Sequence, residues 1–80
     1  MPAISIRYFA ILREQRGVSA EQLTTEETTP AALYDALRAK YGFTLPGDRV
    51  RAAVNGEFVD AQHALHDRDE VVFIPPVAGG

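Results

Sequence analysis

The sequence predicts a single α+β domain in which one mixed β-sheet packs over one main helix. Only one segment of the 80 residues has the length and the apolar period of a core helix, whereas several short segments have the alternation or the β-branched content of strands. A chain of this length can build one hydrophobic core but not two. The composition, 46% hydrophobic and 24% charged, is that of a globular protein.

The first part of the chain predicts a strand, a helical turn and a second strand. Ile4, Ile6 and Tyr8 alternate with polar residues, which indicates a half-buried strand. Good helix formers then accumulate and stop at Gly17, so we expect one short helical turn there. Residues 18–27 are rich in Thr and Glu and contain only one large apolar residue, which predicts a strand at an edge of the sheet.

The main helix is predicted over residues 30–41. Thr29 offers an N-cap hydroxyl, and Pro30 takes the first helical position, where its missing N–H costs nothing. An apolar stripe with a period of four residues follows, formed by Leu33, Leu37 and Tyr41 with Ala36 beside them. Gly42 is expected to end the helix in the left-handed conformation.

A β-hairpin is predicted in the second half of the chain. After a loop over residues 43–49, two strand-like runs at 50–54 and 57–59 are separated by Asn55-Gly56. Asn-Gly between two such runs is the strongest short-range hairpin signal, because both residues tolerate a positive φ.

The last strand is predicted over residues 70–74, after a polar loop that ends in a tight turn at 67–69. Its continuous apolar run indicates a central strand that is covered on both faces. Pro75-Pro76 ends it, since neither residue can donate to a ladder. If the first and last strands pair and the helix crosses between them, the fold is the ubiquitin-like β-grasp, which is one of several α+β options that the pattern allows.

Composition excludes several classes of function. The net charge of −3 and the lack of a basic run argue against binding to nucleic acid or to a membrane. The absence of cysteine excludes disulfides and thiolate sites and is consistent with a cytoplasmic protein. His63 and His66 lie in a polar loop and are expected to be solvated rather than metal-bound. No phosphate-binding or nucleophile motif is present, so we expect no metal, no cofactor and no catalytic turnover by this chain alone.

The C-terminus is the unusual feature of the sequence. Residues 75–80 are expected to form a flexible tail on a domain that spans residues 1–74. The stiff Pro75-Pro76 pair would project a tail that ends in Gly79-Gly80 and that is narrow enough to enter a channel in a partner. The reactive group is then the α-carboxylate of Gly80, which is a poor acyl donor until an ATP-using partner adenylates it.

Three stretches carry a resemblance to a known family. They are residues 8–17 with Phe9-Ala10 and Arg13-Glu14, residues 51–59 with Ala53-Val54-Asn55, and residues 65–80 with Pro75-Pro76-Val77-Ala78-Gly79-Gly80. Together they resemble the small subunits of molybdopterin synthase, which are sulfur carriers with the β-grasp fold. One departure is Arg68, where the family often has Gly, so we expect an ordinary right-handed residue in that turn.

The resemblance implies a specific chemistry. An adenylyltransferase related to the ubiquitin-activating enzymes would adenylate Gly80, and a sulfur donor would convert the acyl-adenylate into a thiocarboxylate. The carrier would then donate sulfur to a pterin precursor in the large subunit of molybdopterin synthase, within a heterotetramer, during molybdenum cofactor biosynthesis. Besides the reacting Gly79 and Gly80, the residues expected to bind partners are Phe9, Arg13, Phe73, Pro75, Pro76, Val77 and Ala78.

Three other functions stay open at this point. A sulfur carrier of thiamin synthesis would use the same chemistry at Gly80 with a different acceptor. A ubiquitin-like modifier would form isopeptide bonds with lysines. An interaction domain would carry an inert tail. Sequence also leaves open whether Tyr8, Phe58 and Phe73 form the core or an interface.

Overall fold

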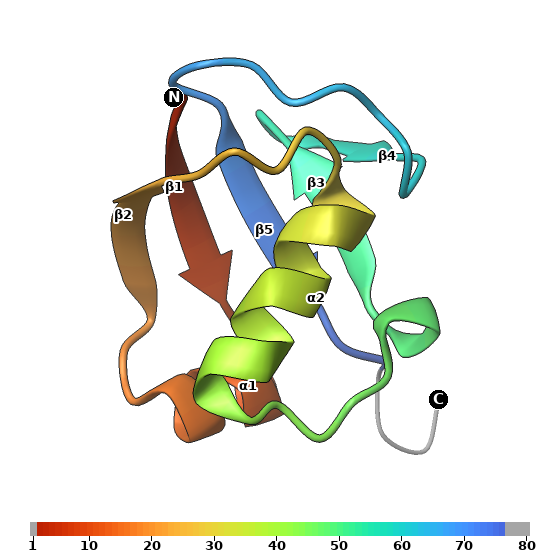
Figure 1. The fold of residues 1–80 in the computed structure, drawn as a ribbon. Coiled ribbons are helices and arrows are strands. Elements are labelled where there is room, and N and C mark those ends of the chain that lie inside the picture. Colours follow the sequence, from red (N-terminus) through yellow and green to blue (C-terminus); the bar gives the residue numbers. More distant parts are fainter. Residues whose placement is uncertain (1, 77–80) are drawn as a thin grey trace.

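The computed structural model describes residues 2–76 and has the predicted α+β architecture (Figure 1). One mixed sheet contains five strands in the order β2-β1-β5-β3-β4. The elements in chain order are β1 (Ala3–Tyr8), α1 (Ala10–Arg16), β2 (Ala20–Thr24), α2 (Pro30–Tyr41), the 3₁₀ helix η1 (Gly47–Arg49), β3 (Arg51–Val54), β4 (Glu57–Val59) and β5 (Glu70–Ile74). The sheet lies on one side of α2, which crosses it obliquely.

The pairing of the strands is that of a β-grasp fold. β1 pairs in parallel with β5, the last strand, and antiparallel with β2. β3 lies antiparallel to both β5 and β4. The prediction that the first and last strands pair across the helix connection is therefore confirmed, as are the central place of β5 and the edge place of β2.

The helix signals and the hairpin signal were read correctly. Thr29 Oγ1 accepts a hydrogen bond from the backbone N–H of Ala32 at 3.2 Å, and Gly42 ends α2 with φ of 74°. Asn55 and Gly56 have φ of 53° and 88°, so a two-residue turn joins β3 to β4, as predicted.

The core lies between α2 and the sheet. Every second residue of the central strands points to it: Ile4, Ile6 and Tyr8 on β1, and Val71 and Phe73 on β5, each at most 1% exposed. Tyr34 of α2 stacks on Phe43 at 5.8 Å between ring centroids and meets the Phe73 ring edge-on at 5.3 Å. These contacts fix the height of α2 above the sheet.

Three expectations about individual positions were wrong. Ala36 is exposed, and Tyr34 fills the position on the apolar face of α2 that Ala36 was expected to share. β5 is covered on one face only, because Val71 and Phe73 are buried whereas Val72 and Ile74 are half-buried. The second face of β5 thus presents apolar side chains that are not fully buried in the core.

The third wrong expectation concerns Arg68, which has φ of 70° and is left-handed. The turn around it is tied to the start of β1 on both sides. The backbone N–H of Arg68 donates to the carbonyl of Ala3 at 2.7 Å, and Asp67 Oδ1 accepts from the N–H of Ala3 at 2.7 Å. These two bonds hold the chain in a conformation that suits glycine better than arginine.

Within residues 2–76, neither α-helix combines the length and the hydrophobicity that crossing a bilayer requires.

Candidate functional site

The segment that carries the predicted chemistry begins where β5 ends. Ile74 is the last residue of β5, Pro75 is buried and Pro76 is exposed. Val77, Ala78, Gly79 and Gly80 lie outside the described residues, so their predicted roles and the domain boundary at residue 74 stay predictions.

The face of the sheet that α2 leaves uncovered, called the open face below, carries an apolar band. Phe58 of β4 lies opposite Ala53 of β3, and Ala53 lies opposite Val72 of β5. Phe58 is 60% exposed, Val72 and Ile74 are half-buried, and the small Ala53 is buried between its larger neighbours. The band thus crosses three strands and reaches the last residue of β5, from which the tail continues.

Charged residues border this band. Arg7 and Glu70 form an exposed ion pair at 3.4 Å, and the guanidinium carbon of Arg51 lies 4.5 Å from the centre of the Phe58 ring. The ion pair contributes little to stability because water screens it. Exposed aromatic residues together with arginine are typical of protein interfaces, so this composition suits the open face to binding another protein.

The turn from β1 into α1 extends the band along its border. Phe9 keeps the extended backbone of the strand, with φ of −129°, so its side chain falls on the open side of Tyr8 and is 46% exposed. Ala10 then turns sharply with φ of 51°, a left-handed conformation that is strained for alanine. On α1, Ile11 is 37% exposed and Arg13 is exposed.

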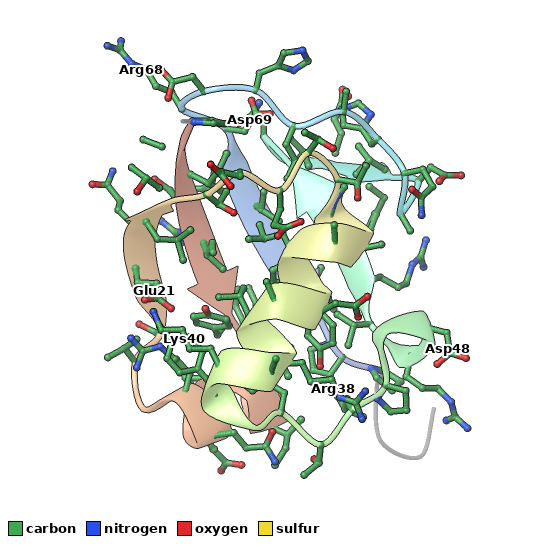
Figure 2. The ribbon with its side chains drawn as sticks, in the orientation of Figure 1. Glu21, Arg38, Lys40, Asp48, Arg68 and Asp69 are labelled. Carbon is green, nitrogen blue, oxygen red and sulfur yellow. The ribbon has the colours of Figure 1, made fainter. Side chains whose placement is uncertain are left out.

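A hydrogen-bonded network centred on Glu21 holds α1 in place. The Tyr8 hydroxyl donates to Glu21 Oε2 at 2.6 Å, and the Arg16 guanidinium donates to both carboxylate oxygens at 2.9 and 3.0 Å. Arg16 also stacks over the ring of Tyr41, at 4.1 Å from its centre. Figure 2 shows Glu21 pointing from β2 toward the C-terminal end of α2, where Lys40 lies. One carboxylate thus joins β1, β2, α1 and α2.

The network shifts the pKa of Glu21 and of Tyr8. The hydrogen bonds from Arg16 lower the pKa of Glu21, and although burial opposes this shift, the Tyr8 hydroxyl adds to it. Burial and the nearby Glu21 carboxylate raise the pKa of Tyr8 well above its usual range. Glu21 is therefore ionised and Tyr8 neutral at pH 7, and the network has a structural rather than an acid–base role.

A second network holds the β3–β4 turn and the loop before β5 together, at the end of the sheet where β5 begins. Asp69 accepts hydrogen bonds from the Asn55 side chain at 2.9 Å and from the backbone N–H of His66 at 2.8 Å. Burial by itself would raise the pKa of Asp69, but these bonds outweigh it and hold the pKa below its usual value. Asn55 also accepts from the N–H of Glu70 at 2.9 Å, so the hairpin turn is fastened to the start of β5.

The residues that the sequence predicts to bind partners differ in their exposure to solvent. Phe9, Arg13 and Pro76 are exposed. The side chain of Phe73 is 1% exposed and packs against Tyr34, and Pro75 is buried as well, so neither side chain is accessible to a partner in this structure. Strand alternation places Phe73 on the helix side, so the neighbouring Ile74 is the residue that reaches the open face.

The sequence of the hairpin contains the signal that places Phe58. The two-residue Asn-Gly turn pairs Val54 with Glu57, which puts Phe58 opposite Ala53. Because Val54 and Ala52 face the core, Ala53 and Phe58 must face the other way. Of the three aromatic residues that sequence left open, Tyr8 and Phe73 belong to the core and Phe58 does not.

Among the described residues, no group of three or more acidic or histidine side chains is arranged to hold a metal ion. His63 and His66 are both exposed in the loop that precedes β5. Within residues 2–76 the clearest candidate for a binding site is therefore the apolar band of the open face.

Comparison with known proteins agrees with this geometry. The sequence profile of the ThiS family matches residues 6–80. The molybdopterin synthase sulfur carrier subunit of Escherichia coli K12 is 36% identical over 80 residues, which cover 96% of this chain and 99% of that protein. The subunit of the same name from Haemophilus influenzae is 31% identical, with the same coverage of both chains.

Solved structures share the whole fold. SAMP1 from Haloferax volcanii aligns with a TM-score of 0.77 at 26% identity and covers 98% of this chain and 99% of its own. A putative molybdopterin converting factor subunit 1 from Pyrococcus furiosus aligns with a TM-score of 0.78 at 28% identity, over 96% and 100% of the two chains. The resemblance stated from the sequence is confirmed, and the chain belongs to the ThiS family, together with the sulfur carrier subunits of molybdopterin synthase.

Proposed function

We propose that this protein is the sulfur carrier subunit of a molybdopterin synthase and that its reacting group is the C-terminal carboxylate of Gly80. The observation that carries the proposal is the nearly full-length identity of 36% to a carrier of that name. The ending Pro75-Pro76-Val77-Ala78-Gly79-Gly80 supports it, because its last three residues have no side chain larger than a methyl group. Such an ending suits a carboxylate that must enter a narrow site in another protein.

The chemistry proceeds in two steps at one carbon atom. The Gly80 carboxylate attacks the α-phosphate of ATP, pyrophosphate leaves, and an acyl-adenylate forms. A sulfur nucleophile then replaces AMP at the carbonyl carbon and leaves a thiocarboxylate. The described residues offer no side chains arranged for this chemistry, so an adenylyltransferase related to the ubiquitin-activating enzymes performs the activation. The carrier acts in the reducing cytoplasm and is recharged after each transfer.

The open face is the surface that we assign to the large synthase subunit. Phe58 and Ile74 of the apolar band, together with Phe9 at its border, provide apolar anchors. The band ends at Ile74, which is followed by the C-terminal segment of the chain. Aromatic anchors of this kind commonly dominate the binding energy of an interface. Docking on the open face would place the tail next to the partner without disturbing the core, and two such pairs would form a heterotetramer. A solved complex of subunits 1 and 2 of the molybdopterin-converting factor from Helicobacter pylori shares the fold, with a TM-score of 0.68 at 23% identity.

Intact mass spectrometry tests the proposal. The full chain is incubated with its activating enzyme, MgATP and sulfide as the sulfur source. We expect a mass gain equal to the difference between one sulfur and one oxygen atom, located by fragmentation at Gly80. A variant that lacks Gly80 is the matched control and should gain nothing. If the full chain remains unchanged while the enzyme charges another carrier under the same conditions, the proposal is wrong.

A second candidate function is protein modification, and the likeness to SAMP1, a small archaeal modifier protein, favours it. An activated Gly80 would then acylate a lysine amine instead of accepting sulfur. The two functions differ in their products. Isopeptide conjugates resist hydroxylamine and map to Gly80 and a target lysine, whereas the sulfur carrier ends in a thiocarboxylate and is not conjugated to another protein.

A further inference from the structure

A groove of about 680 Å³ lies on the helix side of the sheet, away from the open face. It runs between the first half of α2, η1 and the β3–β4 hairpin. Figure 1 shows its origin, since α2 passes in front of β5, whereas η1, β4 and the lower part of β3 lie to the right of the helix. The core residues Tyr34 and Phe73 form its floor, and the half-buried Ala31, Val50 and Val59 contribute its apolar walls.

The charged residues that line the groove are two aspartates and Arg51. Asp35 on α2 and Asp48 on η1 line it, and both are exposed. Within residues 2–76 neither carboxylate takes part in an ion pair. The Asp35 carboxylate lies against η1, because a Cβ atom built on Gly47 would be 3.3 Å from Asp35 Oδ1. Figure 2 shows Asp48 projecting from the neighbouring η1 turn. The two carboxylates are therefore carried on the two walls of one groove.

No arginine forms an ion pair with either carboxylate within residues 2–76. The guanidinium of Arg51 lies over Phe58, on the opposite face of the sheet. The Nε of Arg38 donates to the carbonyl of Phe43 at 3.1 Å, and Arg49, which follows Asp48 on η1, is exposed. Both carboxylates can therefore still accept an ion pair, and a ligand that supplies both an apolar body and a positive charge fits the groove.

We propose that this groove binds a basic segment of a partner protein, in which an aliphatic side chain enters between Ala31 and Val59 and flanking Lys or Arg residues pair with Asp35 and Asp48. The charge argues against two other occupants. The C-terminal carboxylate of the chain's own tail would be repelled by both aspartates, and a second copy carries the same net charge of −3. The groove and the open face lie on opposite sides of the sheet, so one molecule can bind two different partners at once.

The experiment uses the full ¹⁵N-labelled chain and a defined probe, the peptide acetyl-Arg-Leu-Arg-Leu-Arg-amide. Its charge-reversed counterpart, acetyl-Glu-Leu-Glu-Leu-Glu-amide, controls for unspecific apolar binding. We expect saturable amide shifts at Ala31, Asp35, residues 47–50 and Val59 with the basic peptide only. Amides of the open face, such as Val72 and Ile74, should move little.

Matched variants identify the groups that bind. The double variant Asp35→Asn with Asp48→Asn should weaken binding about fivefold, as expected for losing two exposed charge pairs. Glu14→Gln removes an exposed carboxylate on α1, away from the groove, and should leave binding unchanged. Ala31→Leu fills the groove and should abolish binding. The N–H of Ala31 keeps its bond to the carbonyl of Ala61 in this variant, so the fold has no reason to change.

Several outcomes would overturn the proposal. They are the absence of saturable shifts, shifts centred on the open face, or binding that the double Asn variant does not weaken. Shifts of the groove amides that depend on protein concentration alone would show that a second copy occupies the groove. Shifts of the same amides on deletion of residues 77–80 would show that the chain's own tail does so.

Discussion

The two faces of the sheet use the same strands for different purposes. On the helix side, Ile4, Ile6 and Val71 are completely buried and Phe73 is 1% exposed. On the open face, the residues between them are half-buried or exposed, and the most exposed large apolar side chain of the described chain, Phe58, lies there. Neighbouring residues of one strand therefore have two different surroundings, the core on one side and, in our proposal, a partner on the other.

This difference shows why apolar content alone misleads in β5. The run Val71-Val72-Phe73-Ile74 has the composition of a strand buried on both faces, yet α2 covers only one of them. In the described residues nothing packs on the other face, so its apolar side chains are available to a partner.

Neighbouring substitutions in β5 should differ most strongly. Phe73→Ala removes a buried ring and should destabilise the domain by about 3–5 kcal/mol, which is enough to unfold much of a protein this small. Ile74→Ala, one residue further, should cost less than about 1.5 kcal/mol because its side chain is only partly buried. Urea unfolding followed by circular dichroism measures both. Equal costs would mean that the open face is part of the core.

Phe58 should affect binding and leave stability unchanged. We expect Phe58→Ala to weaken binding to the large synthase subunit by about 30-fold, the usual effect of losing an interface anchor. Its melting temperature should stay within about 3 °C of wild type because the ring is 60% exposed. Glu26→Gln, at an exposed position of the loop between β2 and α2, is the control and should change neither quantity. Isothermal titration calorimetry showing unchanged affinity for Phe58→Ala would remove the open face from the interface.

The Glu21 network links the core to the border of the open face. It holds α1, which carries the exposed Ile11 at that border, against the core. Glu21→Gln should destabilise the protein by about 1–3 kcal/mol at pH 7, since Arg16 and Tyr8 lose a charged acceptor. Arg16→Lys should lose part of the same stability, because an ammonium group cannot reproduce the two-pronged contact.

The same network predicts a pH dependence with a definite sign. The pKa of Glu21 is lower in the folded protein than its ordinary value of 4.5, so its stabilising effect is complete above that value and is lost as the pH falls through the folded-state pKa. The stability difference between wild type and Glu21→Gln should therefore shrink below about pH 4.5. Denaturant melts at a series of pH values measure this. A constant difference down to pH 3 would show that the carboxylate charge is irrelevant.

The smallest effect is expected in the turn at the far end of the sheet. Arg68→Gly should stabilise the protein by up to about 1 kcal/mol, because glycine adopts the left-handed conformation without strain. The ion pair that is lost, between Arg68 and Asp67, is highly exposed and contributes little. Arg49→Gly in η1 is the matched control and should destabilise slightly. Stabilisation by both variants would mean that the effect is not local to the turn.

Local chemistry made most of the fold predictable. The capped helix from Thr29 to Gly42 and the Asn55-Gly56 hairpin are specified by residues that lie next to each other in the chain. The prediction that the first and last strands pair with each other was correct, because few α+β arrangements place these two strands side by side in the centre of a sheet.

The failures arise where distant contacts decide. Arg68 is left-handed because two bonds to Ala3 hold its turn, and nothing near it in the sequence indicates those bonds. The Glu21 network joins residues from four elements, so no spacing along the chain reveals it. Phe73 and Ile74 look alike in sequence, and only the position of α2 shows which of them is buried. The proposed chemistry of Gly80 takes place in partner proteins, so the residues of this chain alone do not specify it.

The central claim, that the Gly80 carboxylate is the reacting group, is tested most directly by lengthening the chain by one alanine after Gly80. The added residue moves the carboxylate by about 3.5 Å along the chain, and a displacement of about 1 Å can already cost about 100-fold in rate. We predict a melting temperature equal to that of the wild type, no thiocarboxylate in the intact mass and no sulfur transfer to the pterin precursor. An extended protein that is untrimmed by intact mass, yet is charged and donates sulfur at the wild-type rate, would contradict the account.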